Sequence, residues 1–207
     1  MQAGDGLWQP SPAETAVVIM LTSTNHQEIC RMFATLLSYP DDSVRQTAVD
    51  CAAQLRELDS AAADPMARFA AFLAGQQPSR LEELFTETFD LQPVCHPYVG
   101  YQLCGESQQR TMFLIRLQQL YRQHGFSGGS ELPDHLATML QFVGTVAERE
   151  CGLEIVRDGL LPALEKILAG LEGKVPPYVE LLKAVQRFLT ETVDAGTELL
   201  TANGRRS

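Results

Sequence analysis

Apolar residues recur with the spacing of an α-helix along most of this 207-residue chain, and the alternation typical of strands is almost absent. Residues 29–37 form the clearest stripe, and the same i, i+3, i+4, i+7 spacing returns in the pattern that starts at Leu136. Each stripe must be buried against neighbouring helices. The pattern therefore predicts an all-α fold, a single-domain helical bundle of roughly eight helices.

Capping and helix-breaking residues divide the chain. Ser79 and Glu82 have the spacing of a capping box, and a long helix is expected over residues 107–124. The run SGGS at residues 127–130 predicts a flexible loop, a candidate hinge between an N-terminal and a C-terminal set of helices. Pro162 predicts a kink or a new helix start. We expect a flexible extension over residues 1–22, a helical domain over residues 23–202 and a flexible tail over residues 203–207.

The charge, cysteine content and hydropathy exclude several classes of protein. The formal net charge is −10 at pH 7, and no basic stripe of the kind that binds nucleic acid is present. The apolar run AVVIML at residues 16–21 is far shorter than the about 20 residues of a membrane-spanning helix, so no stable membrane insertion is expected. Five cysteines, an odd number at wide spacing, favour reduced thiols over a disulfide framework.

Motifs of enzymes and metal sites are weak. Neither an HExxH arrangement nor a phosphate-binding glycine loop occurs in the sequence. Cys95, His96 and Cys104 form the only cluster of cysteine and histidine, and they lack the spacing of a zinc finger. We expect no catalytic residue and no metal site. A metal- or thiol-dependent helical enzyme that uses these three residues stays as the alternative.

The stretch ELPDHL at residues 131–136 crowds polar residues at the start of an apolar helix. Pro133 suits the first helical turn, and the carboxylates of Glu131 and Asp134 are expected near the positive end of the helix dipole. A charged His135 would oppose that dipole, so we expect this imidazole to be neutral or paired with a carboxylate. Two interpretations stay open: a helix cap, or a polar binding site.

Several stretches together resemble one protein family. LLSYPDD at residues 36–42, TFDL at 88–91 with the following Tyr98, Gly105-Glu106 with Arg110, and LQQLYRQHGF at 117–126 are similar to signatures of the NarJ/TorD family of molybdoenzyme-specific chaperones. The resemblance is closest to the NarJ branch, also called the nitrate reductase delta subunit, and ELPDHL resembles its most recognisable motif. Thr111 departs from the pattern, which usually has glycine after the arginine.

The resemblance implies a TorD-like, all-helical and non-enzymatic chaperone in the cytoplasm that needs no cofactor. Its partner would be the N-terminal peptide of a molybdoenzyme catalytic subunit, by default the nitrate reductase alpha subunit. The chaperone would assist molybdenum cofactor insertion and complex assembly. We expect a monomer or a domain-swapped homodimer, with the loop at residues 127–130 as the hinge. A structural subunit of a mature redox complex is a further alternative.

The resemblance also assigns roles to individual residues. A helical peptide would lay its apolar face into a groove between helices, with acidic residues around it tuning specificity and association rate. The expected peptide-binding residues are Phe89, Tyr98, Glu106, Tyr121, Glu131, Asp134 and His135. The expected structural residues are Asp90, Arg110 and Pro133, with an ion pair between Asp90 and Arg110.

Overall fold

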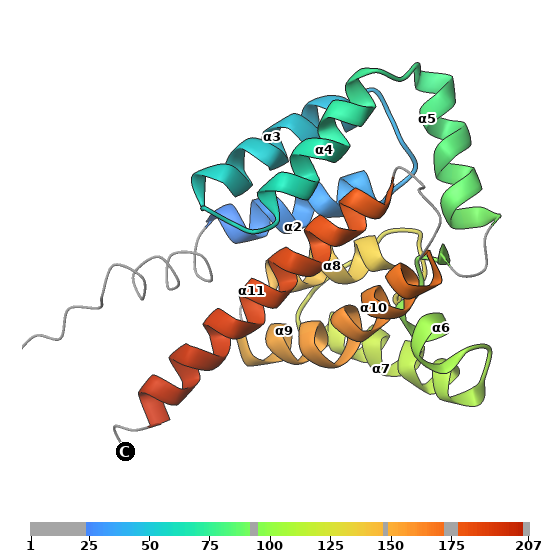
Figure 1. Cartoon of the computed structure of the whole chain (residues 1–207). Coiled ribbons are helices and arrows are strands. Elements are labelled where there is room, and N and C mark those ends of the chain that lie inside the picture. Colours follow the sequence, from blue (N-terminus) through green and yellow to red (C-terminus); the bar gives the residue numbers. More distant parts are fainter. Residues whose placement is uncertain (1–23, 92–94, 147–148, 172–177, 205–207) are drawn as a thin grey trace, which may run out of the picture.

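The computed structural model describes residues 24–91, 95–146, 149–171 and 178–204, and these residues form an all-α fold (Figure 1). No strand occurs among them. The helical elements are α2 (Thr24–Leu36), α3 (Val44–Glu57), α4 (Ala63–Ala74), α5 (Pro78–Phe85), η1 (Thr86–Asp90), α6 (Val99–Cys104), α7 (Gln108–Gln123), α8 (Leu136–Thr145), α9 (Arg149–Ile155), η3 (Val156–Leu160), α10 (Leu161–Gly170) and α11 (Tyr178–Gly204). The predicted all-α bundle is confirmed.

The helices form two sets that meet along α2, α8 and α11 (Figure 1). Helices α2, α3 and α4 pack on one another in the first set, and α6 to α10 form the second. Helix α2 packs closely on α8 because Gly144 has no side chain: a Cβ at this position would lie 2.8 Å from the Cβ of Cys30. The buried residues form one continuous core, from Ile29 in α2 to Leu189 in α11.

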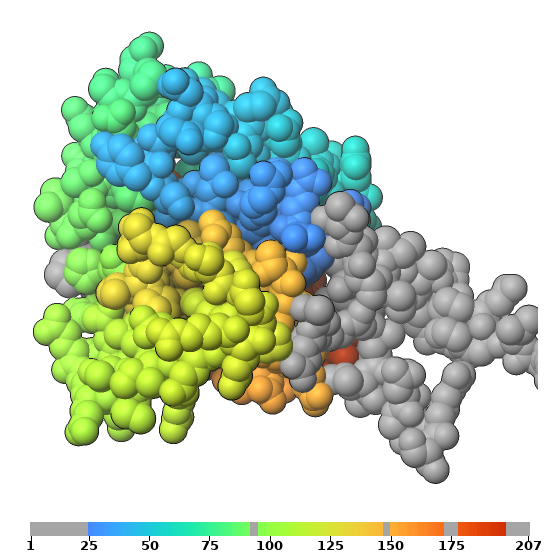
Figure 2. All heavy atoms as spheres, turned by 180° about the vertical axis from the view of Figure 1, so that it is seen from behind, coloured from blue at the N-terminus to red at the C-terminus, as the bar shows by residue number. Residues whose placement is uncertain are grey.

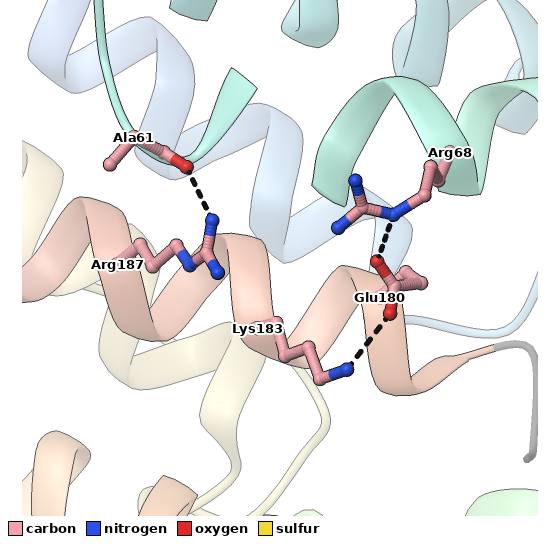
Figure 3. Close-up of polar contacts among 5 residues, drawn as sticks. All are labelled: Ala61, Arg68, Glu180, Lys183 and Arg187. Carbon is pink, nitrogen blue, oxygen red and sulfur yellow. Dashed lines mark hydrogen bonds and ion pairs between the residues drawn. The ribbon is translucent and has the colours of Figure 1, made fainter. Parts of the chain in front are cut away.

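Polar contacts hold α11 against α4 and the turn before it (Figure 3). The Nε of Arg68 in α4 lies 2.6 Å from the Oε2 of Glu180, whose other oxygen is 3.0 Å from the Nζ of Lys183. Arg187 donates a hydrogen bond of 3.0 Å to the carbonyl oxygen of Ala61. These contacts lie beside the seam at which Phe69 of α4 packs on Tyr178 of α11, with ring centroids 5.4 Å apart.

Several predicted boundaries shift by one or a few residues. Helix α5 begins at Pro78 with Gln77 as its N-cap, so Ser79 is inside the helix rather than capping it. Proline suits the first position because it has no N–H to leave unpaired. At Pro162 the helix changes type without a break: the π-helical turn η3 ends at Leu160, α10 begins at Leu161, and both residues have helical backbone angles.

Both ends of the predicted domain fall partly outside the described residues. The predicted extension lies outside them, as do residues 205–207. Helix α11 includes residues 203 and 204, which the sequence assigned to the tail. None of the described helices combines the length and the apolarity that crossing a bilayer requires.

Candidate functional site

Two segments far apart in the sequence pair through their backbones beside α7. Val99 donates a hydrogen bond of 2.7 Å to the carbonyl oxygen of Asp134, and Leu136 donates one of 2.7 Å to the carbonyl oxygen of Pro97. Between them, Tyr98 and His135 form an isolated antiparallel bridge. This pairing brings the polar residues of ELPDHL to the start of α6, and they meet α7 there.

A buried ion pair joins this bridge to α7. The Nε of Arg110 lies 3.1 Å from the Oδ2 of Asp134, whose side chain has no exposed surface, while the arginine side chain is 18% exposed. The second oxygen of Asp134, Oδ1, has no hydrogen-bond partner among the described residues. The close approach depends on Gly100, because a Cβ there would lie 2.8 Å from Oδ2. Asp134 therefore relies on one arginine for its charge compensation.

His135 is the N-cap of α8, which begins at Leu136. Its Nδ1 accepts a hydrogen bond of 3.2 Å from the backbone N–H of Ala137, so the ring carries its proton on Nε2. Burial lowers the pKa of His135, and the nearby carboxylates of Glu131 and Asp134 oppose that shift. The imidazole is therefore held neutral. Both interpretations of ELPDHL meet here, since the capping residue is also part of a polar cluster.

Tyr98 closes the cluster toward the solvent. Its ring packs edge-on against the ring of His135 with centroids 5.3 Å apart, and the guanidinium of Arg110 lies 5.5 Å from its centroid. The Tyr98 hydroxyl donates a long hydrogen bond of 3.5 Å to the exposed Glu131. Burial, and then the charges of Glu131 and Asp134, raise the pKa of Tyr98. We call Tyr98, Arg110, Glu131, Asp134 and His135 the polar latch.

Tyr121 supports the polar latch through the turn that contains Pro133. Its hydroxyl donates a hydrogen bond of 2.8 Å to the carbonyl oxygen of Pro133, and its ring packs on Phe126 and Phe142 with centroids 5.0 and 4.7 Å apart. The side chain is only 5% exposed, and burial raises its pKa. Pro133 lies in the turn before α8 rather than in its first helical turn, so that part of the prediction is wrong. His135 itself is extended, with φ −67° and ψ 134°, so α8 begins only at Leu136.

Three further predicted site residues lie elsewhere. Phe89 is 1% exposed and packs on Phe85 and Tyr178, with centroids 5.0 Å from each, so it is a core residue in this conformation. Glu106 lies exposed in the turn between α6 and α7. Asp90 is exposed at the end of η1, and Arg110 pairs with Asp134 instead. The predicted ion pair between Asp90 and Arg110 is thus wrong.

Sequence reasoning missed the cleft that runs along α7 beside the latch. One hollow of about 440 Å³ lies between α7, Met139 of α8 and the segment from α9 to η3. A second hollow of about 470 Å³ shares Phe113 and Arg116 with it and extends toward Cys104. We call the two together the α7 cleft. Phe113 also lies next to Gly100, and therefore connects the cleft to the latch.

The surface of α7 shows the signal that could have revealed the cleft. Met112 and Ile115 are 47% and 43% exposed, and they lie outside the stripe that buries Leu117 and Tyr121. Figure 2 shows the yellow-green surface of α7 open on the face opposite to that of Figure 1. Apolar residues on both sides of one helix indicate a second partner for it.

The alternative hypothesis of an enzyme relies on Cys95, His96 and Cys104, and these residues do not form a metal site. No group of three or more metal-ligating side chains comes together in the part of the chain that the structure describes. Cys95 is fully buried and Cys104 is half-buried. His96 contacts the carbonyl oxygen of Phe89 through Nδ1, at 3.1 Å. The contact of His96 with Phe89 thus links the residues before α6 to η1.

Comparisons with known proteins agree with this architecture. The family model described as nitrate reductase delta subunit matches residues 55–183. The probable nitrate reductase molybdenum cofactor assembly chaperone NarJ of Bacillus subtilis (strain 168) is 30% identical over 164 residues, 78% of this chain and 88% of that protein. The nitrate reductase molybdenum cofactor assembly chaperone NarJ of Escherichia coli (strain K12) is 26% identical over 164 residues, 77% of this chain and 69% of that protein.

A solved structure supports the fold. The crystal structure of a putative redox enzyme maturation protein from Archaeoglobus fulgidus matches with a TM-score of 0.55, at 19% sequence identity. The match covers 90% of this chain and 99% of that chain. At this identity the likeness shows a shared helical architecture.

Proposed function

The chain belongs to the nitrate reductase delta subunit family, and on that premise we propose that it binds the N-terminal segment of a nitrate reductase catalytic subunit. The NarJ relatives from Bacillus subtilis and Escherichia coli are assembly chaperones, so its role is that of a chaperone in molybdoenzyme maturation. In this proposal it holds the segment in the cytoplasm while molybdenum cofactor is inserted and the complex assembles. It binds a peptide and makes no bond itself.

The α7 cleft carries the proposal. Its walls are largely apolar, with Leu117, Leu120 and Ile155 among them, and it is open to solvent. A peptide that becomes helical on binding buries one apolar face in a groove between helices. The cleft offers such a groove between α7 and the segment from α9 to η3.

The polar latch supports the peptide-binding role as well. Arg110 and Phe113 are one helical turn apart on α7, so the latch holds the end of the helix that forms one cleft wall. Glu131 is exposed beside it and offers a carboxylate to a basic residue of the peptide. Tyr98 and Glu131 therefore stay in the proposed site. The buried Asp134, His135 and Tyr121 brace it, and Phe89, which is also buried, does not contact the peptide.

Calorimetric titration with synthetic N-terminal peptides of candidate catalytic subunits tests the proposal. We expect one peptide to bind with 1:1 stoichiometry, and Met112→Glu to weaken it at least about tenfold, which is roughly 1.4 kcal/mol. Val49→Glu is the matched control, because Val49 is an apolar residue of α3 that is 51% exposed. Equal affinity in both variants would place the peptide outside the α7 cleft.

A further inference from the structure

Helix α7 differs from the rest of the protein in charge. It contains Arg110, Arg116 and Arg122 and neither aspartate nor glutamate, although the whole chain carries a net charge of −10. Arg110 is paired with Asp134, whereas Arg116 and Arg122 are exposed and make no ion pair with another described residue. The open side of α7 is therefore both apolar and positively charged.

The opposite wall of the cleft is acidic, so the lining of the cleft as a whole is close to neutral. Glu154 and Asp158 lie on it, and both are exposed. Asp158 is already paired with Arg157, the Nε of which is 3.0 Å from its Oδ1. Arg116 lines both hollows of the cleft. A ligand that lies in the cleft therefore gains mainly from the apolar side chains, and an acidic group gains only where it lies beside Arg116.

One segment of this chain has that chemistry. Residues 7–21 contain one acidic residue, Glu14, and no lysine or arginine. They also contain the pair Leu7-Trp8 and the apolar run AVVIML at residues 16–21. Apolar groups of this size gain roughly 25 cal/mol per Å² when they leave water, so they favour an apolar cleft over solvent.

The segment is long enough to reach the cleft. It is attached at Thr24, where α2 begins, and α2 lies against the end of α8: the carbonyl oxygen of Gln27 is 3.3 Å from where a Cβ of Gly144 would be. Helix α8 in turn contributes Met139 to the cleft. When residues 7–21 are docked, residues 22 and 23 form the linker, so the end of the docked segment lies near Thr24, whereas Trp8 can lie up to about 53–58 Å from Thr24. A body of this size has a radius of gyration of about 16 Å.

We propose that residues 7–21 of this chain dock in the α7 cleft and compete there with the client peptide. The inference rests on the proposed function for the competition, but the docking itself does not depend on it. Docking leaves only a fraction of the molecules with an unoccupied cleft, and the apparent affinity for the client falls in proportion to that fraction. Basic clients that displace the segment are favoured, because Glu131 and the acidic wall remain available to them.

Tryptophan fluorescence tests the docking directly, since Trp8 is the only tryptophan of the chain. We expect blue-shifted emission in the full chain, a shift to the emission of water-exposed tryptophan in Met112→Glu, and no change in Val49→Glu. The shift should persist on dilution, as an intramolecular contact requires. Water-like emission in the full chain overturns the proposal. So does a blue shift that survives Met112→Glu, or one that disappears on dilution and thereby reveals docking onto a second copy.

Client titration tests the competition separately. Deletion of residues 1–19, which leaves Met20 as the first residue, should raise the affinity for a binding peptide about three- to tenfold. Unchanged affinity in the deletion variant refutes competition. If neither the full chain nor the deletion variant binds any client peptide, the proposed function fails, while the response of Trp8 still decides the docking.

Discussion

Replacement of Arg110 by methionine tests the central contact of the polar latch. The variant keeps most of the apolar stem of the side chain but leaves the Asp134 carboxylate buried, with Oδ1 and Oδ2 both lacking a partner among the described residues. Removal of one partner of a buried ion pair costs about 3–5 kcal/mol. For a chain of this size each kcal/mol lowers the melting temperature by roughly 2–4 °C, so we expect a decrease of about 6–20 °C.

Arg157→Met is the matched control for this variant. The ion pair of Arg157 with Asp158 has a similar length, 3.0 Å, but its side chains are 58% and 67% exposed. Exposed pairs contribute little because water already solvates both charges. We expect thermal melts followed by circular dichroism to show a large decrease for Arg110→Met and no measurable change for Arg157→Met.

A double variant separates loss of charge compensation from loss of packing. Replacing Asp134 by leucine in the Arg110→Met background removes the unpaired charge, so most of the lost stability should return. The reasoning is refuted if Arg110→Met melts within about 2 °C of the wild type, which is below the decrease expected for even 1 kcal/mol in most proteins of this size. It is also refuted if the double variant is less stable than Arg110→Met.

Three further outcomes are expected. Gly100→Ala, whose added methyl would lie 2.8 Å from the latch carboxylate, should lower the urea midpoint, whereas Gly75→Ala, with its nearest neighbour at 3.7 Å, should not. Burial lowers the pKa of His135 in the folded state, so its contribution to stability is fully present above pH ~6.5 and is lost as the pH falls through the folded pKa. Urea titrations of His135→Gln from pH 7.5 to 5 should lack this loss of stability. If the variant and the wild type show the same pH dependence, the assignment of His135 as a neutral cap is contradicted. Burial raises the pKa of Cys30 to about 12 and that of Cys51 as well, so mass spectrometry should find neither thiol alkylated by iodoacetamide until the protein unfolds.

The fold was predictable because the helices are encoded locally. Each apolar stripe shows its own buried face, and Ser107 does cap α7 by accepting a hydrogen bond from the N–H of Arg110. The neutral state of His135 also follows from local reasoning, since a positive charge at a helix N-terminus opposes the helix dipole. The two π-helical turns have no comparable signal, because each is only five residues long and too short to show a periodicity of its own.

The site was only partly predictable, because its contacts are not local. The partner of Arg110 is decided by the pairing of residues 97–99 with residues 134–136, and no helical periodicity encodes that pairing. From the sequence alone, Asp90 and Asp134 are equally plausible ion-pair partners of Arg110. Phe89 was misplaced for a similar reason: its aromatic partner Tyr178 comes from the distant helix α11.

The backbone pairing of residues 97–99 with residues 134–136 holds together the two ends of the segment that contains α6 and α7. Everything between the two paired segments forms an arm, whose far end reaches solvent at Gly105 and the neighbouring turn. Helix α7 buries only Leu117 and Tyr121, whereas α8 buries seven residues, so amide hydrogens of α7 should exchange before those of α8.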